Sequence, residues 1–219
     1  MKLFKNIKKW LENQAHLFYL FLLILIVPNI ILCFTEPMPI VAKVCNVLLP
    51  FAFYYLLMTL SRDCGKMFWI LFLFIFFGAF QIVLLYLFGQ SIIAVDMFLN
   101  LVTTNSSEAM ELLDNLVPAL VSVIILYIPA LILAAISIIK KRKLSLEFIR
   151  REREKAWIAL LIGFISLGAA YGLDKRYELK SDLYPANVCY NVALAFQRNA
   201  QTRTYHRTSE NFTFNAQPS

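Results

Sequence analysis

The sequence has few of the residues that build a metal centre or a hydrolytic active site. It contains four cysteines and two histidines, and no two cysteines have the C-x-x-C spacing of a metal site. His16 and His206 are solitary, so a zinc site cannot be assembled from these residues. No serine, histidine and acid set and no glycine-rich phosphate loop is present either. We therefore expect free thiols, with Cys33 and Cys45 the only pair that could meet.

Charged residues are also nearly absent from the long apolar runs. Lys43 is the one ionisable residue well inside a run, and it lies near the outer end, where a lysine can extend to the interface. Pumps and ion-coupled transporters need ionisable groups within the membrane. The sequence therefore disfavours that class, and it shows no inverted repeat that would favour it.

Apolar residues dominate instead. The chain of 219 residues is 60% hydrophobic, with a mean hydropathy of +0.66, whereas roughly half of the residues in a soluble domain are apolar. A spanning helix needs about 20 residues. The runs that approach or exceed this length are 17–34, 40–60, 67–89, 117–139 and 156–173. We therefore predict an all-α, polytopic membrane protein with five transmembrane helices.

The first run is preceded by lysines, a pattern that signal peptides share. Its apolar core is long, however, and no A-x-A-like cleavage site follows it. We therefore expect a retained signal anchor.

Basic residues collect in the short segments between the runs. The N-terminus has four lysines, the 61–66 loop has Arg62 and Lys66, and the 140–155 segment has eight lysines and arginines, whereas 90–116 has none. The positive-inside rule then places the N-terminus in the cytoplasm and everything after Leu173 outside. The net charge of +7 is thus explained by topology rather than by nucleic acid. Anionic-lipid binding is a second role open to 140–155.

Residues 96–115 (DMFLNLVTTNSSEAMELLDN) carry acids without bases and have a helical repeat of apolar positions. Asn100, Thr104 and Glu108 are spaced by four, so on one helix they stack on one face. An amide, a hydroxyl and a carboxylate could then present together to a small polar group.

Two other interpretations of this stretch stay open. Asn105 and Glu108 fit a capping box, in which case a new helix begins near Ser106 and the stretch is a helix pair. Alternatively, one amphipathic helix lies on the membrane with a solvated acidic face.

The chain changes character after the fifth run. Pro185 followed by Asn187 can start a helix, and Tyr184 and Tyr190 suit the headgroup region, so we predict an interfacial helix. From residue 200 to 219 no pattern could bury a core, and we expect an extended segment or a single strand. This divides the chain into a transmembrane domain, 1–173, that includes the 90–116 loop, and an outer interfacial helix and linker, 174–219.

Together these features resemble the N-terminal membrane domain of bacterial phosphoethanolamine transferases, a family that includes the lipid A transferases behind colistin (polymyxin) resistance. In the loop between the third and fourth spans, that family carries a pattern close to D-M-x-x-(x)-N-x-x-x-T-[DN]-x-x-E-A. Here the pattern is matched by Asp96, Met97, Asn100, Thr104, Asn105, Glu108 and Ala109. The segments YPANVCYNVALA and SENFTFNA also resemble the linker that precedes the catalytic domain in this family. The resemblance covers nearly the whole chain.

The resemblance implies a two-step transfer in the periplasm of a bacterium. A sulfatase-like domain with a zinc-activated threonine takes phosphoethanolamine from phosphatidylethanolamine and passes it to lipid A or a related envelope acceptor. The threonine and the zinc ligands belong to a domain that would follow Ser219, so this chain alone is expected to be inactive and to hold no catalytic or metal residue. By position, Asn100, Thr104 and Glu108 are implied to bind the phosphatidylethanolamine headgroup.

The rival interpretation comes from another class of protein. It is a non-enzymatic inner-membrane scaffold or assembly subunit whose acidic outer helix docks a protein. Its expected sign is an exposed apolar patch on the outer segments instead of a polar trio.

Overall fold

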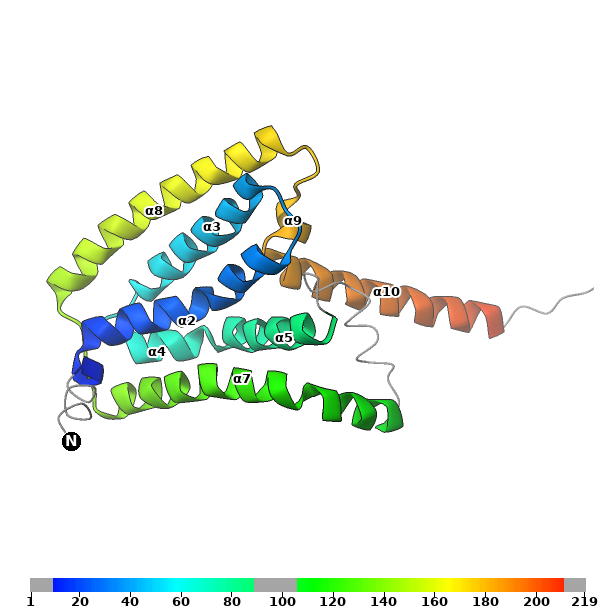
Figure 1. The fold of residues 1–219 in the computed structure, drawn as a ribbon, viewed down its shortest axis with the longest axis horizontal. Helices are drawn as coiled ribbons and strands as arrows, with labels where there is room; N and C mark the ends of the chain where they lie inside the picture. Colours follow the sequence, from blue (N-terminus) through cyan, green and yellow to red (C-terminus); the bar gives the residue numbers. More distant parts are fainter. Residues whose placement is uncertain (1–9, 89–105, 211–219) are drawn as a thin grey trace, which may run out of the picture.

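The apolar runs form long helices in the computed structural model, which describes residues 10–88 and 106–210. All regular elements of these two ranges are helical, so the all-α prediction is confirmed for the described part of the chain (Figure 1). The elements are α2 (Gln14–Thr35), α3 (Ile40–Met58), α4 (Cys64–Ile70), α5 (Phe72–Phe88), α7 (Ser106–Ile139), α8 (Leu146–Leu173), α9 (Leu179–Asp182) and α10 (Ala186–Glu210).

Four of the described helices are long and apolar enough to cross a membrane. They are α2, α3, α8 and the Val117–Ile139 part of α7. Helices α4 and α5 pass the same test together but are bent by 61°, so they count as a fifth span only if the bent pair is one span. The chain is thus a polytopic helical protein, with four or five spans in its described residues.

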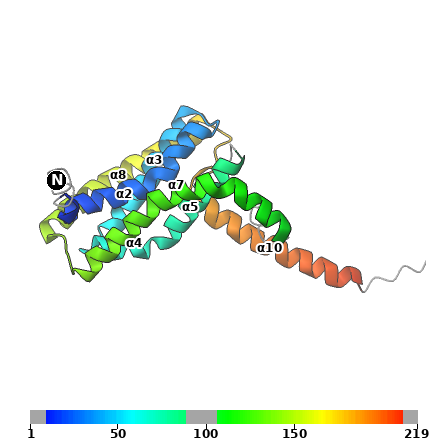
Figure 2. The same cartoon turned by 60° about the horizontal axis from the view of Figure 1, so that its bottom comes forward.

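The helices form a bundle in which α2 and α3 lie between α8 and the α4, α5 and α7 helices (Figures 1 and 2). Helix α3 packs against α8 on one side and α2 on the other, while α7 packs against α4 and α5. Large apolar side chains fill the space between them. Phe21 and Phe68, for example, are fully buried and stack with their ring centroids 4.4 Å apart.

Two glycines allow the helices to approach closely. A Cβ atom on Gly65 of α4 would lie 2.5 Å from the carbonyl oxygen of Ala134 in α7. A Cβ atom on Gly163 of α8 would lie 3.1 Å from the Cα atom of Leu49 in α3. Small residues at helix contacts let backbones come together where lipid supplies no hydrophobic driving force.

One end of the bundle gathers the described basic segments, and we call it the basic end. The turn after α3 pairs with the loop before α8: Arg62 Nε donates to the Leu144 carbonyl at 2.9 Å, and Leu144 N donates to the Arg62 carbonyl at 2.8 Å. Arg153 Nη2 also donates to the carbonyl of Thr59 at 2.7 Å. The 61–66 and 140–155 segments therefore share one end, as the charge pattern predicts.

The opposite end, from which α10 departs, is held by buried amides; we call it the α10 end. Asn29 Nδ2 donates to the carbonyls of Asn46 at 2.9 Å and Tyr184 at 2.7 Å. Asn46 Nδ2 donates to the Asp182 carbonyl at 2.7 Å, and its Oδ1 accepts from the Tyr177 hydroxyl at 2.8 Å. Burial raises the pKa of Tyr177 above its ordinary value, so the hydroxyl stays a donor. These bonds fix the chain around α9 onto α2 and α3.

Two features of the helices differ from the expectations. The run 67–89 is interrupted at Leu71, although residues 66–77 contain no glycine or proline that would mark a break. Helix α10 continues to Glu210, so the prediction of an extended segment is wrong for residues 200–210. Residues 186–210 contain no helix breaker, and Gln, Arg and Ala favour helix, so the helix continues even where its apolar side ends.

The four cysteines are free, as expected. Cys33 Sγ donates to the Lys43 carbonyl at 3.1 Å, while Cys45 Sγ lies 3.6 Å from the oxygen of the Tyr177 hydroxyl. Both thiols are therefore occupied by contacts at the α10 end and form no bridge.

We predict that Asn46→Leu loosens the chain around α9. The substitution leaves the Tyr177 hydroxyl and the Asp182 carbonyl without their amide partner, at a cost of about 1–3 kcal/mol. Trypsin should then cut faster at Lys175, Arg176 or Lys180, which mass spectrometry of the fragments would detect. Ser122→Ala is the matched control, because that hydroxyl bonds only to its own helix at Pro118. Equal cleavage rates in the two variants would contradict the role of Asn46.

Candidate functional site

The predicted headgroup-binding trio lies only partly within the described chain. Asn100 and Thr104 fall in 89–105, outside the described residues. Glu108 lies in the first turn of α7, of which the structure describes the backbone but not this side chain. The convergence of the three side chains therefore stays a prediction.

Helix α7 is described from Ser106, directly after the residues 89–105 that lie outside the described chain. From there it continues without a break to Ile139. The second half of the 96–115 stretch is thus continuous with a candidate spanning helix.

The length of α7 carries Glu108 beyond the apolar part of the bundle. The helix has 34 residues, or about 51 Å at 1.5 Å per residue, whereas the hydrocarbon core of a bilayer is about 30 Å thick. Its apolar part is Val117–Ile139, so residues 106–116 add about 16 Å at the α10 end. This is the depth of lipid headgroups or just beyond it.

Buried polar groups also gather at the α10 end. Asn187, in the first turn of α10, is fully buried, and neither of its amide atoms has a hydrogen-bond partner among the described residues. The Tyr127 hydroxyl is buried without a partner as well, while the Tyr184 hydroxyl donates to the Phe74 carbonyl at 2.9 Å. A Cβ atom on Gly78 would lie 3.0 Å from the Tyr127 hydroxyl oxygen and 3.2 Å from that of Tyr184. Both hydroxyls therefore converge on one point of α5.

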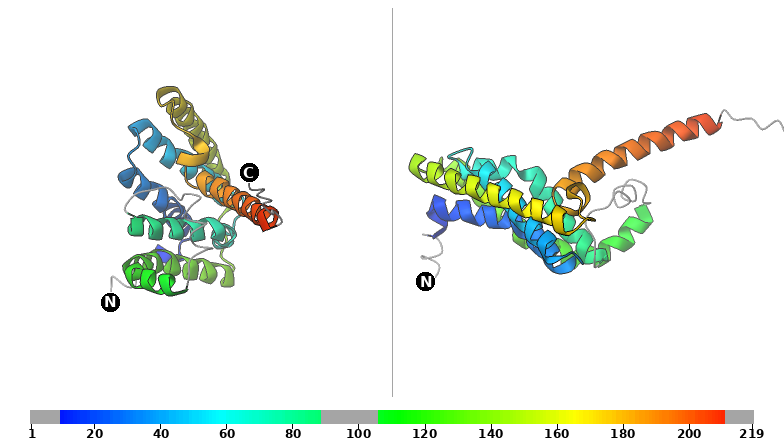
Figure 3. Two further views of the ribbon diagram at one scale, coloured as in Figure 1. Left: turned by 90° about the vertical axis from the view of Figure 1, so that its right-hand side faces the viewer. Right: turned by 90° about the horizontal axis from the view of Figure 1, so that it is seen from above.

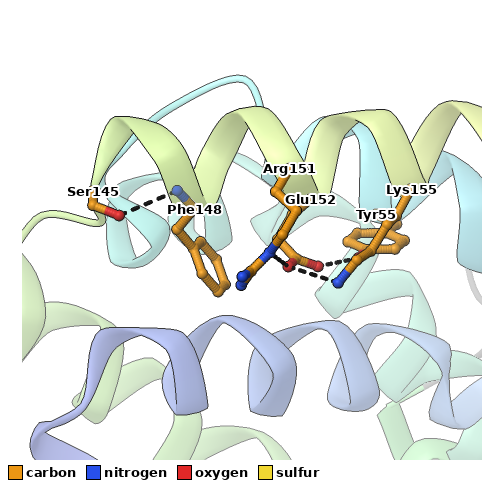
Figure 4. Close-up of polar contacts among 6 residues, drawn as sticks. All are labelled: Tyr55, Ser145, Phe148, Arg151, Glu152 and Lys155. Carbon is orange, nitrogen blue, oxygen red and sulfur yellow. Dashed lines mark hydrogen bonds and ion pairs between the residues drawn. The ribbon is translucent and has the colours of Figure 1, made fainter.

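The basic end contains a buried carboxylate that sequence reasoning missed (Figure 4). Glu152 of α8 is 0% exposed. Its Oε1 accepts from Arg151 Nε at 3.1 Å and Lys155 Nζ at 3.0 Å, and its Oε2 accepts from the Tyr55 hydroxyl of α3. Each carboxylate oxygen thus has a donor, and the cluster joins α8 to α3.

Local sequence explains how α8 presents this carboxylate. Ser145 caps the helix, since its hydroxyl accepts from Phe148 N at 3.1 Å. Lys155 lies three residues after Glu152, a spacing that makes the two side chains neighbours on a helix. The signal in the sequence was an acid between Arg151 and Lys155, just before an apolar run, but Glu147 and Glu154 lie in the same basic segment and nothing in the sequence separates Glu152 from them.

We predict that Glu152→Ala destabilises the bundle by about 2–3 kcal/mol, because the Tyr55 hydroxyl and two cations lose a charged acceptor. Thermal unfolding in detergent would report the loss. Glu152→Gln should cost less, since an amide oxygen can still accept from one of these donors. Glu147→Ala, at an exposed position of the same helix, is the control and should leave the unfolding temperature unchanged. An equal effect of the Glu147 and Glu152 variants would contradict the assignment.

No metal-binding cluster is found in the part of the chain that the structure describes: no three His, Cys, Asp or Glu side chains lie together there. The chain was also compared with known proteins. No protein-family model, no curated protein and no solved structure matches it. The class that the fold establishes is therefore a multi-pass helical membrane protein with a polar α10 end and a basic opposite end.

Proposed function

We propose that this chain is the membrane-anchoring and lipid-donor-binding domain of a phosphoethanolamine transferase. In this proposal it holds phosphatidylethanolamine at the outer face of a bacterial inner membrane, for transfer of phosphoethanolamine to lipid A or a related envelope acceptor. The N-terminus is cytoplasmic and α10 is periplasmic.

The observation that carries the proposal is the resemblance of the 96–109 segment to the family's loop pattern. Four residues match the family pattern in type and spacing: Asp96, Asn100, Thr104 and Glu108. The resemblance extends to the segment that leaves the membrane, where YPANVCYNVALA covers the start of α10.

The architecture of the bundle supports the same function. A lipid-donor site needs a polar surface at the level of the headgroups, and residues 106–116 of α7 extend to that level at the α10 end. Helix α10 departs from the same end and runs away from the bundle (Figure 3), as a connection to an outer domain would. The described basic segments are at the other end, which fits a cytoplasmic face.

In the proposed site, each residue of the trio has a defined task. The carboxylate of Glu108 pairs with the ammonium group of the headgroup, while the Asn100 amide and the Thr104 hydroxyl donate to phosphate or ester oxygens. Binding and orienting the donor is the contribution that we assign to this chain.

We predict that joining this chain to a catalytic domain of the resembling family gives a fusion that modifies lipid A, and that Glu108→Gln lowers this activity at least about tenfold. The reason is that the substitution removes the charge that faces the ammonium group. Mass spectrometry of extracted lipid A measures the product.

Asp114→Asn is the matched control for this experiment. This substitution also removes one acid from the start of α7. Asp114 lies six residues after Glu108, however, and therefore on another face of the helix. The control should keep its activity. A folded fusion that transfers equally with Glu108→Gln would contradict the role of the trio, and a fusion that never transfers would favour the scaffold interpretation.

The proposed orientation can be tested at Cys189, the exposed one of the four cysteines. We predict that a membrane-impermeant maleimide labels intact spheroplasts at this thiol, because the start of α10 faces the periplasm. Cys189→Ser should remove most of the label. Labelling only after the membrane is permeabilised would show that the start of α10 faces the cytoplasm and would contradict the proposed orientation.

A further inference from the structure

A hollow of about 370 Å³ lies between α2 and α3. It is lined by Tyr19, Leu22, Leu23, Ile26, Phe51 and Tyr55. Tyr19 and Tyr55 lie towards the basic ends of their helices, so the hollow occupies the half of the bundle nearest to the basic end. Leu23 is 55% exposed and Tyr19 is 42% exposed. The hollow is therefore open on the side that would face lipid.

The hollow is connected by direct contacts to the Glu152 cluster. The hydroxyl of Tyr55, a lining residue, donates to Glu152. Tyr19, another lining residue, packs edge-on against Phe148, with ring centroids 6.0 Å apart. The Arg151 guanidinium lies over the Phe148 ring, 5.6 Å from its centroid. Two basic side chains thus stand beside an apolar hollow, on the side of α8 that faces α2 (Figure 4).

These two cations keep donor capacity for a further anion. The side chains of Arg151 and Lys155 are 63% and 53% exposed, and both bond the same oxygen of Glu152. Arg151 does so through Nε, which leaves the outer edge of its guanidinium for a phosphate. Two positive charges against one carboxylate give the cluster a net charge of +1.

We propose that this hollow and the two cations form a binding site for an anionic phospholipid of the leaflet at the basic end. One acyl chain lies along Leu22, Leu23 and Phe51, and the phosphate accepts hydrogen bonds from Arg151 and Lys155. The site is remote from the proposed phosphatidylethanolamine site and does not depend on it.

The chemistry of the site favours an anionic lipid over other occupants. A water-soluble phosphate would leave the apolar hollow unused. A zwitterionic lipid would bring its own cation to a cluster that is already positive, whereas an anionic headgroup gains about fivefold in affinity for each basic side chain near it.

The test uses the full chain in mild detergent, with equal amounts of phosphatidylglycerol and phosphatidylcholine added, and native mass spectrometry to count retained lipids. We expect one phosphatidylglycerol to be retained in preference to phosphatidylcholine. Arg151→Gln with Lys155→Gln should lower its affinity about 30-fold, at about fivefold per side chain. Arg150→Gln is the matched control, because Arg150 is an exposed cation of the same helix that pairs with Glu154, and it should retain the lipid.

Two further variants keep the proposal falsifiable if the double variant does not fold. Leu23→Trp narrows the hollow with the cations intact and should weaken the preferred adduct. Glu152→Gln removes the carboxylate that competes with the phosphate and should strengthen binding about fivefold. Equal retention of both lipids by the unaltered chain, or unchanged retention in the Leu23→Trp and Glu152→Gln variants, would overturn the proposal.

Discussion

The buried amides of Asn29 and Asn46 determine how the chain leaves the bundle. A membrane interior offers no water to a polar group, so a buried amide donor is stabilised by an acceptor within the protein. Here the partners are carbonyls at Asp182 and Tyr184, between the last spanning helix and α10. The position of α10 therefore depends on these hydrogen bonds, together with the packing of Val188 of α10 against Leu32 and Tyr184.

The rest of the architecture is an uneven distribution of charge along the bundle, because the basic residues of 140–155 outnumber the acids there, whereas basic and acidic residues are balanced in 174–182. The 61–66 and 140–155 segments lie at one end, where Arg62 and Arg153 donate hydrogen bonds to backbone carbonyls. The Glu152 cluster lies at the same end. At the other end, α7 extends beyond its apolar part and α10 departs. A chain with this division presents different surfaces to the two leaflets, which is the physical basis of the two lipid sites that we propose.

Hydropathy alone predicted the helical class and most helix positions. The run 40–60, for example, became α3 at Ile40–Met58. Run length and periodicity are local quantities, however, and they cannot report pairings between distant residues. Asn29 and Tyr184 are 155 positions apart, and Tyr55 and Glu152 are 97 apart. The break at Leu71 carries no glycine or proline signal, and nothing in the structure explains it.

The proposed headgroup site rests on the resemblance alone. Composition and spacing placed an amide, a hydroxyl and a carboxylate at Asn100, Thr104 and Glu108, but a polar stripe at helical spacing fits a solvated face equally well. Asn187 and Tyr127 could not be anticipated at all, because their significance lies in being buried without partners, a property that only tertiary packing creates.

The central claim is that the outer loop holds a phosphatidylethanolamine headgroup. A photo-crosslinking amino acid at Thr104, activated in intact cells, tests it most directly, with an equivalent probe at exposed Val121 as the reference for ordinary lipid contact. The account predicts that mass spectrometry finds phosphatidylethanolamine adducts enriched at position 104 relative to position 121. Adducts at position 104 that are chiefly proteins, or lipids in the same proportions as at position 121, would contradict it.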